Sequence, residues 1–123
     1  MILTNEQKQV LDVLDNVVCD YFKVSIYDIY WGSSAKIPST ARSYVYYIAH
    51  VDLGISIRCI YKRYNKQERS VYYAISKIRY AIEHFKPYAK EYNEILDKFN
   101  GARNEYDEIS GKFSKARKAL GKS

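Results

Sequence analysis

The sequence predicts an all-α protein. Apolar residues recur at spacings of three and four over most of the 123 residues, which is the period of an amphipathic helix. Typical helix start and stop residues, such as Ser56, Gly54 and Pro87, separate the periodic stretches. The length suits one domain of ordinary size with an appendage. We therefore expect a helical domain over residues 1–86 and a further helix over residues 87–123.

The first helix is expected over residues 6–21, with Thr4 or Asn5 as its N-cap. Its apolar residues share one face, as the helical period requires. They are Val10, Leu11, Leu14, Val17, Val18 and Tyr21. Most of the 14 tyrosines in the chain are expected at surface or half-buried positions, because a tyrosine ring packs while its hydroxyl stays hydrogen-bonded.

Acidic residues dominate the N-terminal segment. Residues 1–31 contain five acids and two bases, so this segment has a net charge of −3 and is not expected to face an acidic partner. Residues 24–30 form a loop or a short helix opened by Ser25. Trp31 follows, and we expect it to pack against the helices; contact with a base or sugar is the alternative.

The next helix is expected over residues 40–52. Pro38 and Thr40 are its start signals, and Gly54 is its stop signal.

A short helix, a tight turn and a longer helix follow. The short helix is expected over residues 57–64, with Ser56 as its cap. The turn over residues 65–67 has the length that a helix-turn-helix uses. The longer helix is expected over residues 68–86, ending before Pro87 because the residue that precedes a proline is pushed out of the helical region.

This longer helix has two different faces. Its apolar stripe consists of Val71, Ile75, Ile78, Ile82 and Phe85, flanked by Ala74 and Ala81. The opposite side carries Arg69, Tyr73, Ser76, Lys77 and Tyr80. A helix with such a polar front fits a DNA major groove, which is about 12 Å wide. A solvated helix face is the alternative.

Charge favours the groove. The chain has a formal net charge of +6 and a pI near 9.2. Residues 58–79 contain seven bases and one acid, so this segment alone accounts for +6. Such a local basic field is typical of phosphate contacts. No stretch approaches the roughly 20 apolar residues needed to cross a bilayer, so no membrane partner is expected.

These residues resemble a known family over about residues 17–82. The run Val17-Val18-Cys19-Asp20-Tyr21-Phe22-Lys23-Val24-Ser25, followed by Asp28-Ile29, is similar to the opening helix and loop of the C-terminal DNA-binding domain of the bacterial replication initiator DnaA. Further matching positions are Arg42, Ala49, Ser56, Ile57 and Ile60. The signature of the family, in a shorter-turn form, is matched by Tyr64-Asn65-Lys66, Ser70-Val71, Ala74 and Lys77-Ile78.

The resemblance implies a DnaA-like, Trp-repressor-like helix-turn-helix core at about residues 56–86 and binding of double-stranded DNA. It does not imply the usual DNA target of the family. Where the family has a His-Thr-Thr run that touches bases, this chain has Glu68-Arg69-Ser70. Where the family has a basic loop with a minor-groove arginine, this chain has residues 31–35, followed by Lys36 as the only charge.

The predicted DNA-binding residues fall into two groups. Cations near the turn are expected to contact phosphates, whereas residues at the start of the last core helix are expected to face base edges. Glu68 either rejects wrong sequences or is an acid favoured by the helix dipole. Arg42 is a phosphate contact in the family, with an ordinary surface cation as the alternative. The full set is Arg42, Arg58, Lys62, Arg63, Lys66, Gln67, Glu68, Arg69, Ser70, Tyr73 and Lys77.

The C-terminal segment carries a heptad seam. Apolar residues alternate at spacings of three and four from Phe85 to Leu120, through both Gly101 and Gly111. This unbroken phase favours a continuous helix that self-associates through residues 88–120 as a homodimer. The alternative is a helix that folds back on its own chain, bent at one of these glycines.

No catalytic, cofactor or metal site is predicted. The chain has no glycine-rich phosphate loop. His50, His84, Cys19 and Cys59 do not have a metal-ligand spacing, and no nucleophile–base arrangement is suggested. The N-terminus lacks a signal-peptide pattern, and the cysteines are expected to be reduced, half-buried thiols. We therefore expect a cytoplasmic protein that associates with the nucleoid when bound to DNA.

The predicted function is sequence-dependent binding of double-stranded DNA, by a small regulator of transcription or replication. Such a reader without an ATPase suits a phage or mobile element as well as a chromosome. The alternative is a DnaA-like module that has lost DNA reading and binds another protein through its heptad helix. Binding of RNA by tyrosine stacking is a third option.

Overall fold

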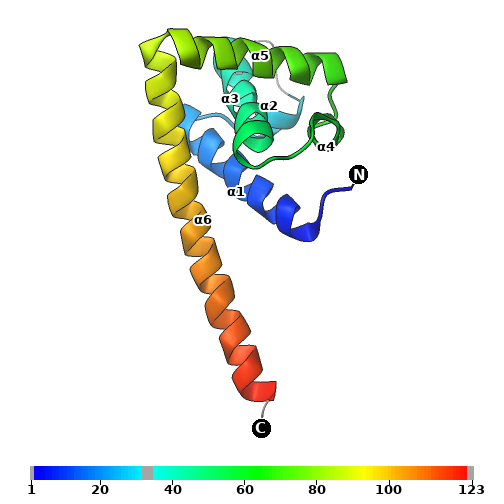
Figure 1. The fold of residues 1–123 in the computed structure, drawn as a ribbon, viewed down its shortest axis with the longest axis vertical. Coiled ribbons are helices and arrows are strands. Elements are labelled where there is room, and N and C mark those ends of the chain that lie inside the picture. Colours follow the sequence, from blue (N-terminus) through cyan, green and yellow to red (C-terminus); the bar gives the residue numbers. More distant parts are fainter. Residues whose placement is uncertain (1, 32–34, 122–123) are drawn as a thin grey trace.

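The computed structural model describes the backbone of residues 2–31 and 35–121, and the side chains of residues 2–31 and 35–105. Every regular element in these ranges is a helix, which confirms the all-α class. The elements in chain order are α1 (Asn5–Phe22), α2 (Ile26–Trp31), α3 (Lys36–Tyr47), the π-helical turn η1 (Ile48–Asp52), α4 (Ile57–Arg63), α5 (Glu68–His84) and α6 (Lys86–Gly121). Figure 1 shows α5 along one end of the molecule and α6 running from that end along the body and past it.

Local signals fix the ends of α1 and α2. The Thr4 hydroxyl accepts from the Gln7 backbone N–H, and the Gln7 side chain accepts from the Thr4 N–H, which completes a capping box. Lys23 ends α1 in the left-handed conformation, at φ 58°. The Ser25 hydroxyl accepts from the Asp28 N–H at 3.2 Å, so this segment is a short helix rather than a loop.

α3 begins earlier than the sequence indicated. Its first residue is Lys36, so Pro38 lies inside the first turn, where a missing N–H is tolerated. The helix then widens into η1, in which the Leu53 N–H donates to the Ile48 carbonyl oxygen at 3.0 Å. Gly54 follows at φ 69°, as its role as a stop signal predicts.

α5 ends two residues earlier than expected. The last helical residue is His84, and Phe85 is extended at φ −126° and ψ 114°. Pro87 explains the break, because its ring would clash with the carbonyl group of Glu83 in a continuous helix. Lys86, although it precedes the proline, is the first residue of α6.

α6 is continuous from Lys86 to Gly121, through both glycines, as the heptad phase predicted. Its first half packs on its own chain against α1 and α5, where Ile95 and Phe99 are fully buried. This part of the predicted self-association surface is therefore occupied within the chain. The seam side chains from Tyr106 to Leu120 lie outside the described residues.

Tyrosine hydroxyl groups attach α6 to three other elements. The Tyr21 hydroxyl of α1 donates to Glu94 at 2.5 Å. The Tyr44 hydroxyl of α3 lies 3.1 Å from Glu91, and that of Tyr92 lies 2.7 Å from Asp52 of η1. As expected, most of the described tyrosines are exposed or half-buried; the four buried ones are Tyr44, Tyr46, Tyr47 and Tyr64.

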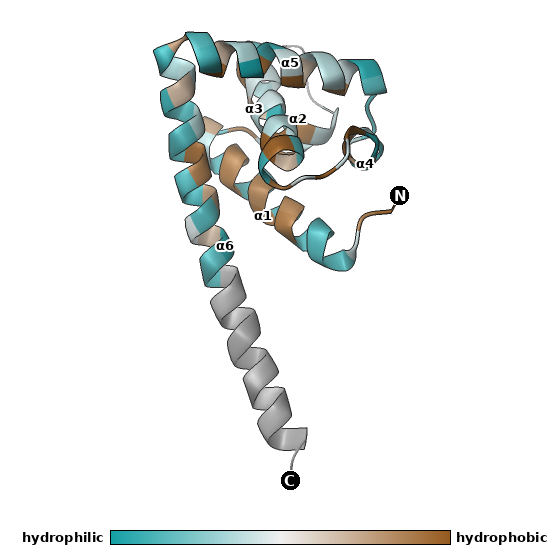
Figure 2. Ribbon diagram, in the orientation of Figure 1, coloured by the Kyte–Doolittle hydropathy of each residue, from teal (hydrophilic) through white to brown (hydrophobic). Residues whose placement is uncertain are grey.

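Hydrophobic residues concentrate where the helices meet. Figure 2 shows brown residues along α1 where it passes the other helices, and mostly pale or teal residues on α5. Cys19 and Cys59 are buried, rather than half-buried as expected. Burial of Cys19 raises its pKa to about 11. The core thus forms behind α5 and leaves the outer side of that helix uncovered.

Candidate nucleic-acid interface

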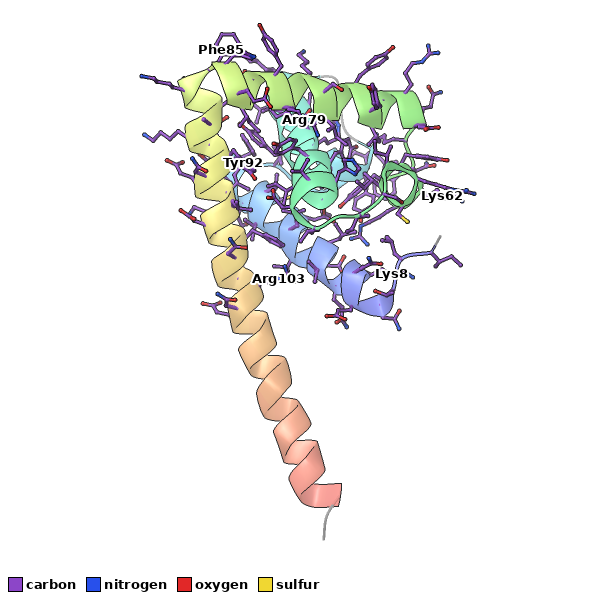
Figure 3. All side chains as sticks on the ribbon, viewed as in Figure 1. Lys8, Lys62, Arg79, Phe85, Tyr92 and Arg103 are labelled. Atoms are coloured by element: carbon purple, nitrogen blue, oxygen red, sulfur yellow. The ribbon has the colours of Figure 1, made fainter. Side chains whose placement is uncertain are left out.

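The outer side of α5 is exposed as predicted. Arg69, Tyr73, Ser76, Lys77 and Tyr80 are all exposed, whereas Val71, Ile75 and Ile78 are buried in the core. Figure 3 shows side chains projecting from α5 away from the body. Phe85, expected at the end of the buried stripe, is instead 52% exposed, because the chain leaves the helix before this residue.

Aromatic rings add to this face. Tyr72 and Tyr73 are 55% and 61% exposed, and their rings meet edge to face with centroids 6.0 Å apart. The Tyr80 ring packs on the His84 ring, with centroids 4.2 Å apart. The Arg79 guanidinium lies 5.9 Å from the centroid of the Tyr47 ring, at the side of α5 that faces α3. Tyr72 was not among the residues predicted from the sequence, although it lies next to Tyr73 in the chain.

The cations of α4 and α5 point in two directions. Arg58, Lys62, Arg69 and Lys77 are exposed, and none of them forms a salt bridge with a described residue. Figure 3 shows Lys62 on α4 extending away from the body. These four side chains remain candidates for phosphate and base contacts.

Arg63 points inward, so its selection as a phosphate contact is corrected. Its Nη2 donates to Asp12 at 2.7 Å and to Asp15 at 3.1 Å, and its side chain is only 11% exposed. A guanidinium held by two carboxylates of α1 cannot reach a phosphate on the surface. Arg63 therefore fixes α4 to α1 instead.

Asp15 is the centre of this buried cluster. The Tyr64 hydroxyl donates to its Oδ1 at 2.6 Å, and the Tyr30 hydroxyl donates to its Oδ2 at 3.4 Å. Burial raises the pKa of Asp15 to about 6, although Tyr64 and Arg63 oppose the shift. The sequence held a signal that was not used: Asp15 lies on the same helical face as Leu11 and Val18. The cluster positions the turn between α4 and α5 because Tyr64 is its first residue.

The turn leads into α5, whose N-terminus has no side-chain cap among the residues that the structure describes. Asn65 is left-handed at φ 54°, and the chain enters α5 through Gln67 and Glu68, both exposed. Gln67 occupies the N-cap position but makes no side-chain cap hydrogen bond. Within the described part of the chain, the first-turn N–H groups of α5 thus have neither a helical partner nor a side-chain cap.

Arg42 and Lys66 lie together beside this helix start. Arg42 Nη1 donates to the Asp28 carbonyl oxygen at 2.9 Å, so the guanidinium is anchored between α2 and α3. Lys66 is half-buried, and its pKa is lowered by burial and by the charge of Arg42. Both residues line a pocket of about 280 Å³ together with Ser70.

The structure thus brings together most of the predicted residues. Arg58, Lys62, Gln67, Glu68, Arg69, Ser70, Tyr73 and Lys77 are exposed on α4, the turn and α5, while Arg42 and Lys66 form a recess at the start of α5. Only Arg63 is turned away from this surface.

Other kinds of site find no support in the described ranges. No cluster of three His, Cys, Asp or Glu side chains able to hold a metal occurs there. Within the same ranges, no helix is long and apolar enough to cross a membrane. In comparisons with known proteins, no family model and no curated protein sequence matches this chain.

Proposed function

We propose that this protein binds double-stranded DNA, with α4, the turn and α5 acting as a helix-turn-helix of the DnaA-like, Trp-repressor-like kind. The observation that carries the proposal is the outer face of α5. It combines exposed Arg69 and Lys77 with exposed tyrosines and Ser76, while the opposite face is buried in the core. A rigidly supported helix of this composition can enter a major groove.

The supporting surface has the charge that DNA requires. Exposed Arg58 and Lys62 on α4, and recessed Arg42 and Lys66, flank the start of α5. In the proposed complex these cations contact phosphates and set the register of the protein on the duplex. In the cluster around Asp15, Arg63 pairs with both Asp12 and Asp15 and so offsets one of their two negative charges.

Base reading would fall to the first turns of α5. Arg69 suits guanine, which accepts two hydrogen bonds from arginine, and Glu68 suits cytosine or rejects other bases. Ser70, Tyr73 and Lys77 follow along the exposed side. A small regulator of transcription or replication is the role that fits such a reader, in a cytoplasmic, nucleoid-associated location.

Fluorescence anisotropy with a pool of random duplexes, at low and at near-physiological salt, tests this proposal. Six cations are assigned to the surface, so the affinity should fall on the order of a thousandfold between about 50 and 200 mM salt. Lys98→Ala, which removes an exposed cation of α6, serves as the matched control and should leave binding unchanged. No binding at low salt would refute the proposal.

An interaction module without DNA binding is the second candidate. Glu68 in place of a base-contacting residue, and a helix α6 that continues past the body in Figure 1, favour it. Self-association would then use residues 106–120, since Ile95 and Phe99 are buried within the chain. Sedimentation equilibrium of the full chain over a range of concentrations decides this point, because a monomer at every concentration would exclude the homodimer.

A further inference from the structure

The pocket between α3 and the start of α5 has an unusual lining. It contains two cations, three serine hydroxyls and a phenol, and none of its lining residues is acidic. The Ser43 hydroxyl donates to the Ser39 carbonyl oxygen at 3.0 Å, so its donor is engaged. Neither the Ser70 hydroxyl nor the Lys66 ammonium group forms a hydrogen bond or ion pair with a described residue. The lining residues are Ser39, Arg42, Ser43, Tyr46, Lys66, Ser70 and Ala74.

Tyr46 contributes a buried donor without a partner. The residue is 3% exposed, and its hydroxyl is buried with no hydrogen-bond partner in the described part of the chain. Its ring is fixed by packing on Tyr64, with centroids 5.4 Å apart. Buried hydroxyl groups nearly always have a partner, because leaving one unpaired costs free energy. Such a group in a pocket wall is therefore a reason to look for a ligand.

The two cations point to the charge of that ligand. Arg42 is anchored by its hydrogen bond to the Asp28 carbonyl oxygen, and Lys66 lies near enough for the two charges to repel. Burial and this repulsion both lower the pKa of Lys66. An anion placed between the two side chains would offset the repulsion and the loss of hydration.

The start of α5 adds a third attraction. Ser70 is in the first turn of this 17-residue helix, and Gln67 at the N-cap makes no capping hydrogen bond. Uncapped N–H groups and the positive end of the helix dipole favour an anion at this end. Three independent features of one pocket thus favour the same class of ligand.

We propose that this pocket is a binding site for a phosphate group. Arg42 and Lys66 supply the positive charge, Ser70 and the first turn of α5 supply hydrogen bonds, and the Tyr46 hydroxyl donates from the pocket wall. A volume of about 280 Å³ leaves room for an ester substituent on the phosphate. A backbone phosphodiester of DNA is the expected source, and this part of the inference rests on the proposed function.

Inorganic phosphate is the probe for the site itself. Titration of the full chain with phosphate against chloride at equal ionic strength, followed by ¹H–¹⁵N NMR, should give saturable shifts at the amides of Lys66, Ser70 and Val71. Lys66→Gln should weaken binding roughly tenfold, the equivalent of one charge-assisted hydrogen bond. Lys98→Gln, on α6, should not change it.

Tyr46→Phe separates this site from a general attraction of anions to a basic surface. The change removes a hydroxyl that has no hydrogen-bond partner among the described residues, so the fold should be retained, and the same spectrum checks this. We expect phosphate affinity to fall severalfold, with the shifts of Ser70 reduced. Shifts that do not saturate, or an affinity unaffected by both Tyr46→Phe and Lys66→Gln, would overturn the phosphate site.

Duplex DNA distinguishes the source of the phosphate. If both variants weaken duplex binding as they weaken phosphate binding, the ligand is a backbone phosphodiester. If phosphate binds and the duplex does not, the pocket is a site for another phosphorylated ligand, and the proposed function is refuted. If the wild-type chain binds the duplex and the variants change neither measurement, the proposed function stands and the pocket inference fails.

Discussion

Arg63 and Lys62 are neighbouring basic residues of α4, and we expect their substitution to affect two different properties. Arg63→Met keeps most of the aliphatic stem but removes the guanidinium that contacts Asp12 and Asp15. Lys62→Met removes an exposed ammonium group that has no described ion-pair partner. The first change should lower stability and the second should lower affinity for DNA.

The size of the Arg63 effect follows from Asp15. Asp15 is 1% exposed, and its pKa is about 6. Without the guanidinium it would take up a proton at pH 7, which costs about 1.4 kcal/mol for the one pH unit between this pKa and pH 7. Loss of the charged hydrogen bond adds about 1.5 kcal/mol. We therefore expect Arg63→Met to lower the free energy of unfolding by about 3 kcal/mol at pH 7 and by about half of that at pH 5.

Urea unfolding followed by circular dichroism, at both pH values, measures this difference. Lys62→Met should stay within about 0.5 kcal/mol of the wild-type chain. Duplex binding by the folded protein should be weaker for Lys62→Met and unchanged for Arg63→Met. A stable Arg63→Met variant that has lost DNA binding would show that the guanidinium faces the nucleic acid, and the assignment of Arg63 to the buried cluster would be wrong.

Three further changes test other parts of the structure. The folded chain holds the proton of Asp15 more tightly than the unfolded chain does, so this group should lower the free energy of unfolding by up to about 3 kcal/mol as pH rises from about 4 to 6. In urea titrations, Asp15→Asn should remove this decrease with pH. An unchanged decrease would show that other groups cause it. Phe99→Ala should cost about 3–5 kcal/mol in the same assay, because this side chain is 1% exposed, and a cost near zero would mean that α6 does not pack on α1. Arg69→Ala should lose roughly 1–3 kcal/mol of discrimination at one base pair, whereas Lys66→Ala should weaken binding to all sequences alike; equal losses on specific and random DNA in both variants would contradict this division of roles.

Local signals were enough to place most helices, and they were insufficient where the backbone departs from the regular period. Ser56 caps α4 as predicted, and Thr4, one of the two predicted candidates, caps α1, since capping depends on residues three positions apart. The π-helical turn at Ile48–Asp52 has no comparable signature in the sequence. The end of α5 was predicted two residues too late. Pro87 acts through its clash with the preceding turn, so the break falls at Phe85, before Lys86.

The candidate site shows the same division between local and distant information. The exposed face of α5 follows from the helical period alone, and so its residues could be chosen from the sequence. Arg63 could not be separated from Lys62 in this way. Its partner Asp15 is 48 residues away in the chain, and only the packing of α4 on α1 brings the two together. The Tyr46 pocket likewise depends on two segments, residues 39–46 and 66–74, that meet only in the fold.

The single extended residue at Phe85 sets the rotational phase of α6. An α-helix turns by about 100° per residue, so one residue inserted beside Phe85 would rotate the whole of α6 by that angle. Ile95 and Phe99 would then leave the core, and the carboxylates that meet Tyr21 and Tyr44 would face elsewhere. The corner is therefore intolerant of insertions and deletions, although Phe85 itself is half exposed. Among chains with this fold, insertions and deletions should therefore be missing at Phe85, and their absence there would identify this arrangement from sequence.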